Sequence, residues 1–217
     1  MKIILIRYGE TIENKEGIIM GHLPGELSEL GVQQARDVAL RLKDEQINHI
    51  FSSDLARALD TTKEIAKYHL NIPITFTKNI RERDWNKFQG LKKKDIPDWE
   101  KIKFNPELNG AEPLKVLYEI AKLFIDNIGT QYPTGNVLIV AHDMINRALI
   151  SVMSGKSWED IEKISKIPHT TINVFNINIQ NDKKNNINKE IQENFSPAKS
   201  GCAYAQKTKQ DFAGNKA

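Results

Sequence analysis

Short aliphatic runs that end at polar residues constrain the fold of this chain most. Residues 2–6 form such a run and are followed at once by Arg7. Residues 136–141 form the most aliphatic run and are followed by His142. Runs of this length without polar alternation are typical of parallel strands buried on both faces. We therefore expect a covered sheet with polar side chains at the carboxyl ends of its strands.

Segments with helical periodicity alternate with these runs. Apolar side chains recur at three- and four-residue spacing and predict helices. The predicted helices cover about 30–43, 55–66, 112–128 and 143–153, and further strands cover 48–52, 72–76 and 171–179. Ser53 or Asp54 is expected to cap the second helix. The alternation predicts an α/β fold, a three-layer sandwich with a mostly parallel central sheet and helices on both faces.

The composition changes near residue 180. Residues 180–217 are rich in lysine and asparagine, and their seven lysines and four acidic residues account for the whole net charge of +3. Such a segment buries little apolar surface, so we predict a disordered tail after a domain spanning 1–179. The domain is neutral, which gives no electrostatic footprint for nucleic acid.

Other sequence features concern the location, cofactors and partners of the protein. We expect no membrane partner, because no run of about 18 apolar residues exists. Cys202 is the single cysteine and no signal peptide is apparent, so we expect a cytoplasmic protein. No histidine pair has metal-ligand spacing, and we predict no metal and no other cofactor. A homodimer is left open.

Several separated segments carry a family resemblance. They are 7–11 (Arg-Tyr-Gly-Glu-Thr) with Asn14; 27–28 with Gly31, Gln34 and Ala35; 52–58 with Thr61 and Thr62; 80–82; 109–112; and 137–142 with 147–149. In this order and at these spacings they resemble the histidine phosphatase superfamily, which also contains the cofactor-dependent phosphoglycerate mutases. The resemblance implies hydrolysis of a phosphomonoester through a covalent phospho-enzyme.

The resemblance also implies residue roles. Arg7 and Arg57 would bind the phosphoryl oxygens with planar, permanently charged forks, aided for Arg57 by the start of its helix. His142 would add a hydrogen-bond donor. Glu82 would protonate the leaving oxygen, which requires a raised pKa. Asp143 is the alternative acid.

Asn14 and Gly21 complete the substrate-binding residues that the resemblance implies, together with Arg7, Arg57 and His142. Beside this pocket, the lysines at 87 and 92–94 are interpreted as a solvated face, although they could touch a second anionic group. The expected ligand is a phosphorylated small molecule.

Tyr8 is the main departure from the family. It stands where the family has its nucleophilic histidine. A phenol has a reference pKa near 10 and supplies little nucleophile at neutral pH. We therefore expect a protein that binds phosphate-bearing molecules with impaired catalysis, either an inactive paralogue or a substituted form of an active enzyme.

Three other functions are weighed against this one. They are an active phosphomonoesterase for small metabolites, a non-enzymatic phospholigand-binding or regulatory module, and a phosphoglycerate mutase. The mutase is less favoured, because fewer than 30 residues separate Glu82 from the 110–112 segment, where the mutases carry a long insertion.

Overall fold

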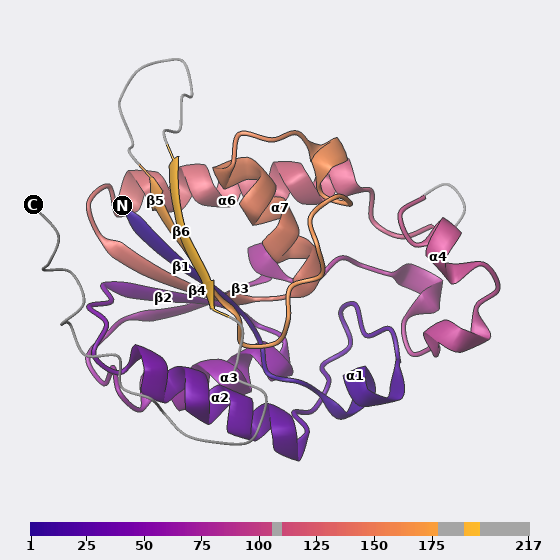
Figure 1. Ribbon diagram of the computed structural model, residues 1–217, viewed down its shortest axis with the longest axis horizontal. Coiled ribbons are helices and arrows are strands. Elements are labelled where there is room, and N and C mark those ends of the chain that lie inside the picture. The colour runs from indigo at the N-terminus through magenta and orange to yellow at the C-terminus, as the bar shows by residue number, and fades with distance from the viewer. Residues whose placement is uncertain (106–109, 178–188, 196–217) are drawn as a thin grey trace, which may run out of the picture.

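The computed structural model describes residues 1–105, 110–177 and 189–195, and its centre is one six-stranded sheet (Figure 1). The strand order is β3-β2-β4-β1-β5-β6. The strands are β1 (Lys2–Arg7), β2 (His49–Ser53), β3 (Ile74–Thr77), β4 (Asn136–Ala141), β5 (Ile172–Ile177) and β6 (Lys189–Phe195). Strands β1 to β4 run parallel, whereas β5 and β6 are antiparallel to their neighbours.

Helices cover both faces of this sheet, as Figure 1 shows with α2 and α3 on one side and α6 and α7 on the other. The helices are α1 (Ile12–Glu16), α2 (Glu29–Leu42), α3 (Ala56–Ala66), α4 (Trp99–Ile102), α6 (Leu114–Gln131) and α7 (Asp143–Met153). Short 3-10 turns lie at Lys78–Ile80, Asn86–Phe88, Lys93–Asp95 and Trp158–Asp160. The predicted three-layer α/β fold is therefore confirmed.

The central strands separate two apolar clusters. Ile3 and Leu5 of β1 pack into the cluster that contains α6 and α7. Ile4 and Ile6 pack into the cluster on the side of α2. All four side chains are at most 1% exposed, because successive side chains of a strand point to opposite faces and both faces are covered. This double burial explains the unbroken aliphatic run.

The start of α3 differs from the prediction. Neither Ser53 nor Asp54 is the N-cap, because Leu55 holds that position and offers no side-chain cap. Ser53 Oγ instead accepts a hydrogen bond from Leu55 N over 3.3 Å. The Asp54 carboxylate accepts hydrogen bonds from Nε and Nη2 of Arg81, each over 2.6 Å, and therefore does not cap the helix.

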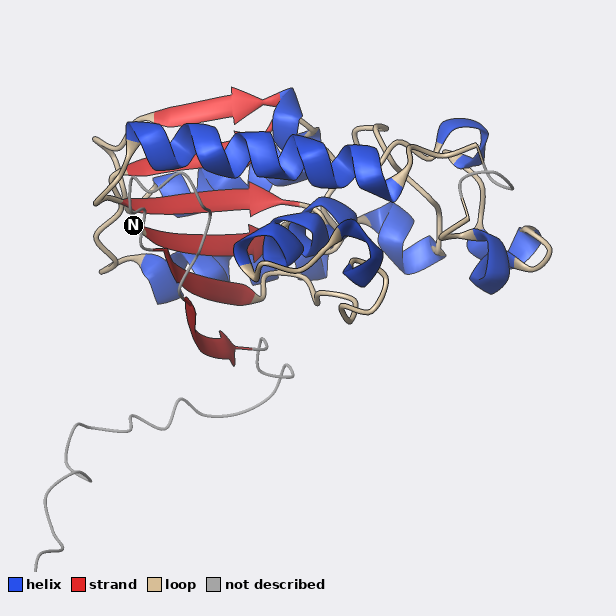
Figure 2. Cartoon of the chain, turned by 90° about the horizontal axis from the view of Figure 1, so that it is seen from above, coloured by secondary structure: helices blue, strands red, loops and turns tan. Residues whose placement is uncertain are grey.

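The boundary at residue 180 also needs a correction. Residues 189–195 fall in the segment predicted to be disordered, yet they form strand β6 beside β5. Figure 2 shows this strand at the edge of the sheet. The rest of the predicted tail, with Cys202, lies outside the described residues, as do 178–179 of the predicted last strand and Asn109.

The helices of the described part are too short or too polar to cross a membrane.

Candidate functional site

A cavity of about 500 Å³ opens beyond the carboxyl ends of the parallel strands. Arg7 ends β1, α3 follows β2, and His142 follows β4, so strand direction gathers distant segments at one edge. Seven of the eight predicted site residues line this cavity: Arg7, Tyr8, Asn14, Gly21, Arg57, Glu82 and Asp143. His142 is fully buried behind them and contacts both Arg57 and Tyr8.

The Tyr8 ring lies close to two guanidinium groups. Its centroid is 5.5 Å from Cζ of Arg7 and 5.0 Å from Cζ of Arg57. The phenol hydroxyl donates to Asn14 Oδ1 over 3.2 Å. Cations are attracted to the face of an aromatic ring at these distances. The ring therefore shares the space of the two arginines that were predicted to bind phosphoryl oxygens.

Most N–H groups of Arg57 donate hydrogen bonds to other residues of the protein. Nε donates to His142 Nδ1 over 3.2 Å, and Nη2 donates to Gly21 O over 2.8 Å. Nη1 donates to the carbonyls of Leu23 and Pro24 over 2.5 and 3.1 Å. A guanidinium has five N–H donors, so these four bonds leave one Nη2 hydrogen for a ligand.

Arg7 is fixed by contacts with another segment of the chain. Its Nη1 donates to Ile167 O and lies 3.9 Å from Asp143 Oδ1. Its Nε is buried and has no hydrogen-bond partner within the described part of the chain. Arg7 thus brings a positive charge with spare donor capacity to the cavity.

His142 is a neutral hydrogen-bond donor. Burial, followed by the charges of Arg57 and Arg7, holds the pKa of His142 well below its usual range. Nδ1 accepts from Arg57, so the proton of the neutral ring sits on Nε2. His142 Nε2 is buried without a partner among the described residues, and the ring lies 5.1 Å from that of Tyr8.

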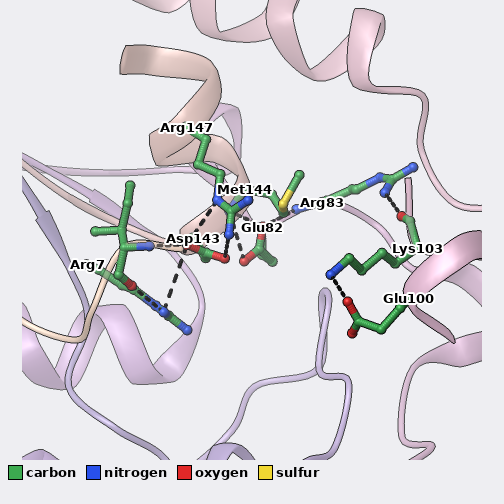
Figure 3. Close-up of polar contacts among 9 residues, drawn as sticks. Arg7, Glu82, Arg83, Glu100, Lys103, Asp143, Met144 and Arg147 are labelled. Carbon is green, nitrogen blue, oxygen red and sulfur yellow. Dashed lines mark hydrogen bonds and ion pairs between the residues drawn. The ribbon is translucent and has the colours of Figure 1, made fainter. Parts of the chain in front are cut away.

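Glu82 has the environment that a proton donor needs. Its Oε1 accepts from Arg83 N over 2.8 Å and from Met144 N over 3.1 Å (Figure 3). Burial and the neighbouring charge of Asp143 raise the pKa of Glu82, against the opposing effects of Arg83 N–H and the two pocket arginines. A raised pKa keeps a carboxyl protonated closer to neutral pH.

Asp143, the alternative acid, is engaged in other contacts. Arg147 donates to both its oxygens, over 2.9 and 3.3 Å, and Ile167 N donates to Oδ1 over 2.8 Å. Figure 3 shows Asp143 between Arg7 and Arg147. Asp143 therefore holds the segment around Ile167 in place and supplies the negative charge that acts on Glu82.

Sequence reasoning missed part of the cavity wall. Lys93 and Lys166 line it, as do Trp85, Trp99 and Phe104. Lys93 was interpreted with its neighbours as a solvated face, because a lysine run does not reveal which member turns toward a cavity. His169 contacts Tyr8 O through Nδ1 over 2.9 Å but does not line the cavity.

This geometry defines an α/β protein with a cationic cavity at the carboxyl edge of a parallel sheet. The chain belongs to the histidine phosphatase superfamily (branch 1), whose family model matches residues 3–189. No group of three histidine, cysteine or acidic side chains suited to a metal ion occurs in the part of the chain that the structure describes.

Known proteins resemble the chain over most of its length. Phosphoglycerate mutase-like protein 4 of Arabidopsis thaliana is 32% identical, over 81% of this chain and 79% of that protein. The structure of Bacillus stearothermophilus YhfR gives a TM-score of 0.78 at 21% identity and covers 90% and 98% of the two chains. Entamoeba histolytica phosphoserine phosphatase, solved with 3-phosphoglyceric acid, gives 0.73 at 22% identity, over 91% and 98%.

Proposed function

We propose that this protein binds phosphomonoesters in the cavity at Arg7 and Arg57 and hydrolyses them poorly or not at all, because Tyr8 occupies the place of the nucleophile. The observation that carries the proposal is the closeness of the Tyr8 ring to both guanidinium groups, whose carbon atoms lie 5.5 and 5.0 Å from the ring centroid. The phosphoserine phosphatase named above, which shares the fold and was solved with 3-phosphoglyceric acid, supports the choice of ligand class.

The residues around Tyr8 suit a phosphoryl group. Such a group spreads negative charge over three oxygens, so fixed donors stabilise it both bound and in transfer. Arg7, the spare Nη2 hydrogen of Arg57 and the Nε2–H of His142 supply such donors. Glu82 would protonate the leaving oxygen while the phosphorus–oxygen bond breaks.

Tyr8 limits the chemical step. A histidine at this position would form a bond from its ring nitrogen to phosphorus, and water would then hydrolyse that bond. A phenol is mostly protonated at neutral pH, and its aryl ester with phosphate is less labile. The phenol ring also lies about as close to both arginines as a bound phosphate would, so it competes with a phosphate for the space beside them.

A working phosphomonoesterase is the second candidate. The raised pKa of Glu82 favours it, because an intact proton donor has no evident use in a pocket that only binds. In that case Tyr8 or a water molecule attacks phosphorus. The short connection between Glu82 and Glu112 continues to argue against a mutase.

Titration calorimetry with inorganic phosphate and phenyl phosphate tests the binding half of the proposal. The full-length chain should bind both, and Arg7→Gln should weaken binding at least about tenfold, because hydrogen bonds to charged groups are strong. Arg81→Gln is the matched control, since Arg81 pairs with Asp54 and does not line the cavity. Absence of binding to the unmodified chain contradicts the proposal.

A further inference from the structure

The peptide group between Glu82 and Arg83 makes hydrogen bonds at both of its polar atoms. Its N–H, which belongs to Arg83, donates to Glu82 Oε1 over 2.8 Å. Its carbonyl oxygen, which belongs to Glu82, lies 2.8 Å from Nε2 of His22. A carbonyl oxygen only accepts, so the His22 ring donates from Nε2. One peptide group therefore joins the His22 ring to the carboxyl group at the cavity.

The backbone around His22 is fixed by two other segments. Gln89 Oε1 accepts from His22 N, and a Cβ atom on Gly21 would lie 2.0 Å from the same oxygen. Arg57 donates to the carbonyls of Gly21 and Leu23, the residues on either side of His22. A half-buried ring on a backbone held in this way has little freedom to move. The Nε2–H of His22 therefore has a set place.

Arg83 holds the other side of this peptide group. Its side chain is buried, and it donates from Nε to Glu112 O and from Nη1 to Lys103 O, both over 2.6 Å (Figure 3). The guanidinium carbon also lies 4.5 Å from the centroid of the Trp85 ring. The peptide group thus has fixed neighbours on both sides, so its N–H keeps its direction toward the Glu82 carboxyl.

The direction of a carboxyl group decides how well it can protonate a leaving oxygen. A proton donor must stand within hydrogen-bond reach of that oxygen, and a displacement of about 1 Å can cost about 100-fold in rate. The side chain of Glu82 is held through Oε1, which accepts from Arg83 N and Met144 N. Loss of the His22 contact would free the peptide group and weaken the first of these two hydrogen bonds.

We propose that His22 is a positioning residue, which orients the Glu82 carboxyl through the peptide group between Glu82 and Arg83. The inference rests on the proton-donor role of Glu82 in the function proposed above and names the group that keeps this donor in place. Nε2 of His22 carries a proton both in the neutral ring that donates here and in the charged ring. The orientation therefore needs the N–H group and not a charge, and an uncharged glutamine amide should replace it.

Carbon-13 NMR of the glutamate carboxyl groups in the full-length chain tests the orientation without relying on turnover. Burial raises the pKa of Glu82 and the Arg83 N–H lowers it, so a weaker Arg83 contact raises it further. His22→Ala should therefore raise the titration midpoint of Glu82 by about half a pH unit or more, and His22→Gln should restore it. Glu82→Gln identifies the resonance.

His69→Ala is the matched control for both experiments. His69 also contacts a backbone carbonyl through Nε2, that of Leu42 over 3.1 Å, and does not line the cavity. The loss of this contact should affect the stability of the fold and leave the titration midpoint of Glu82 unchanged. The control therefore separates a lost histidine–carbonyl contact in general from the one at Glu82.

The second experiment measures kcat in the Tyr8→His background with two leaving groups. His22→Ala should lower hydrolysis of glycerol 2-phosphate by about tenfold or more and that of 4-nitrophenyl phosphate by less than about threefold, because only the first leaving group needs the proton. His22→Gln should keep most of the activity toward both substrates. A histidine that only stabilised the fold would change both rates by the same factor.

The outcomes separate this inference from the proposed function. If His22→Ala leaves the Glu82 midpoint in place, if His69→Ala moves it equally, or if both substrates slow by the same factor, His22 does not position the carboxyl, while phosphate binding stands. If phenyl phosphate fails to bind but the midpoint moves as expected, the proposed function is wrong and the positioning contact stands. If Tyr8→His shows no turnover, the titration midpoint decides the inference by itself.

Discussion

The chemistry of the site depends on which of two neighbouring carboxyl groups carries a proton. Glu82 is buried beside the charge of Asp143, and both influences raise its pKa. Asp143 has its oxygens taken by Arg147 and by Ile167 N. Two carboxyl groups in unlike surroundings can divide their roles. We therefore propose the buried Glu82 as the proton donor.

Glu82→Gln tests this division in a Tyr8→His background, where the account predicts turnover. Loss of a proton donor matters most for a poor leaving group, so hydrolysis of glycerol 2-phosphate should fall by about 10²–10⁴-fold. Hydrolysis of 4-nitrophenyl phosphate, whose leaving group needs no proton, should fall by less than about tenfold. Steady-state kcat values for both substrates decide the matter. If Asp143→Asn shows this leaving-group dependence and Glu82→Gln does not, Asp143 is the acid.

His169 makes the stability of the fold sensitive to acid. Burial, then the charge of Arg7, lowers the pKa of His169 from 6.5 to about 3. Below pH 6.5 the His169 imidazole therefore binds a proton in the unfolded chain but stays neutral in the folded chain. The free energy of unfolding consequently falls as the pH falls. The loss from this histidine reaches about 2 kcal/mol at pH 5.

His169→Gln should consequently flatten the pH dependence of the unfolding free energy. Urea unfolding at pH 5.0 and 7.5 measures it, and the difference between the two pH values should shrink by about 1–2 kcal/mol in the variant. Between pH 7.5 and 8.5 the two proteins should change in parallel. An unchanged difference between pH 5.0 and 7.5 would show that His169 becomes protonated freely in the folded state.

At the scale of elements, the loop after β1 is pressed against the start of α2. A Cβ atom on Gly31 would lie 1.8 Å from Glu10 O, and one on Gly9 would lie 2.4 Å from Gly31 O. Ser28 caps this helix by accepting from Gly31 N over 3.0 Å and donating to Glu10 Oε1 over 2.8 Å. The contact sets the path of the chain just after Tyr8.

Gly31→Ala should therefore destabilise the protein, although alanine is the better helix former. The clash is with backbone, which cannot move aside cheaply, so the unfolding free energy should drop by about 2–3 kcal/mol. Gln33→Ala, on an exposed position of the same helix, should change it by less than about 0.5 kcal/mol. Denaturant unfolding of the two variants compares them. Equal stability of the two would mean that the close approach does not constrain the loop.

At the scale of the whole molecule, periodicity predicted the sheet and its layers well. The double burial of β1 and β4 produces the unbroken aliphatic runs, and the predicted α7 (Asp143–Met153) matches residue for residue. Strand β6 was not predicted, because it pairs only at the sheet edge and its polar sequence carries no burial signal. Capping of α3 failed as a prediction because Asp54 binds Arg81, a contact from a distant segment.

The cavity was also predicted only in part. Arg7, Tyr8 and Glu82 were predicted from their segments and do meet at one cavity. The engagement of Arg57 by the carbonyls of Gly21, Leu23 and Pro24 could not be predicted, because backbone acceptors leave no trace in residue type. Lys166 was missed for a related reason: its place depends on how Asp143 and Arg7 hold the neighbouring Ile167.

Hydrolysis of 4-nitrophenyl phosphate by the unmodified chain, Tyr8→Phe and Tyr8→His tests the central claim most directly. The account predicts negligible turnover for the first two proteins and a rise of at least about 100-fold in kcat for Tyr8→His, because the remaining pocket is in place. Thermal unfolding of the three proteins controls for a loss of fold. Turnover by the unmodified chain that disappears in Tyr8→Phe would contradict the account and identify tyrosine as the nucleophile.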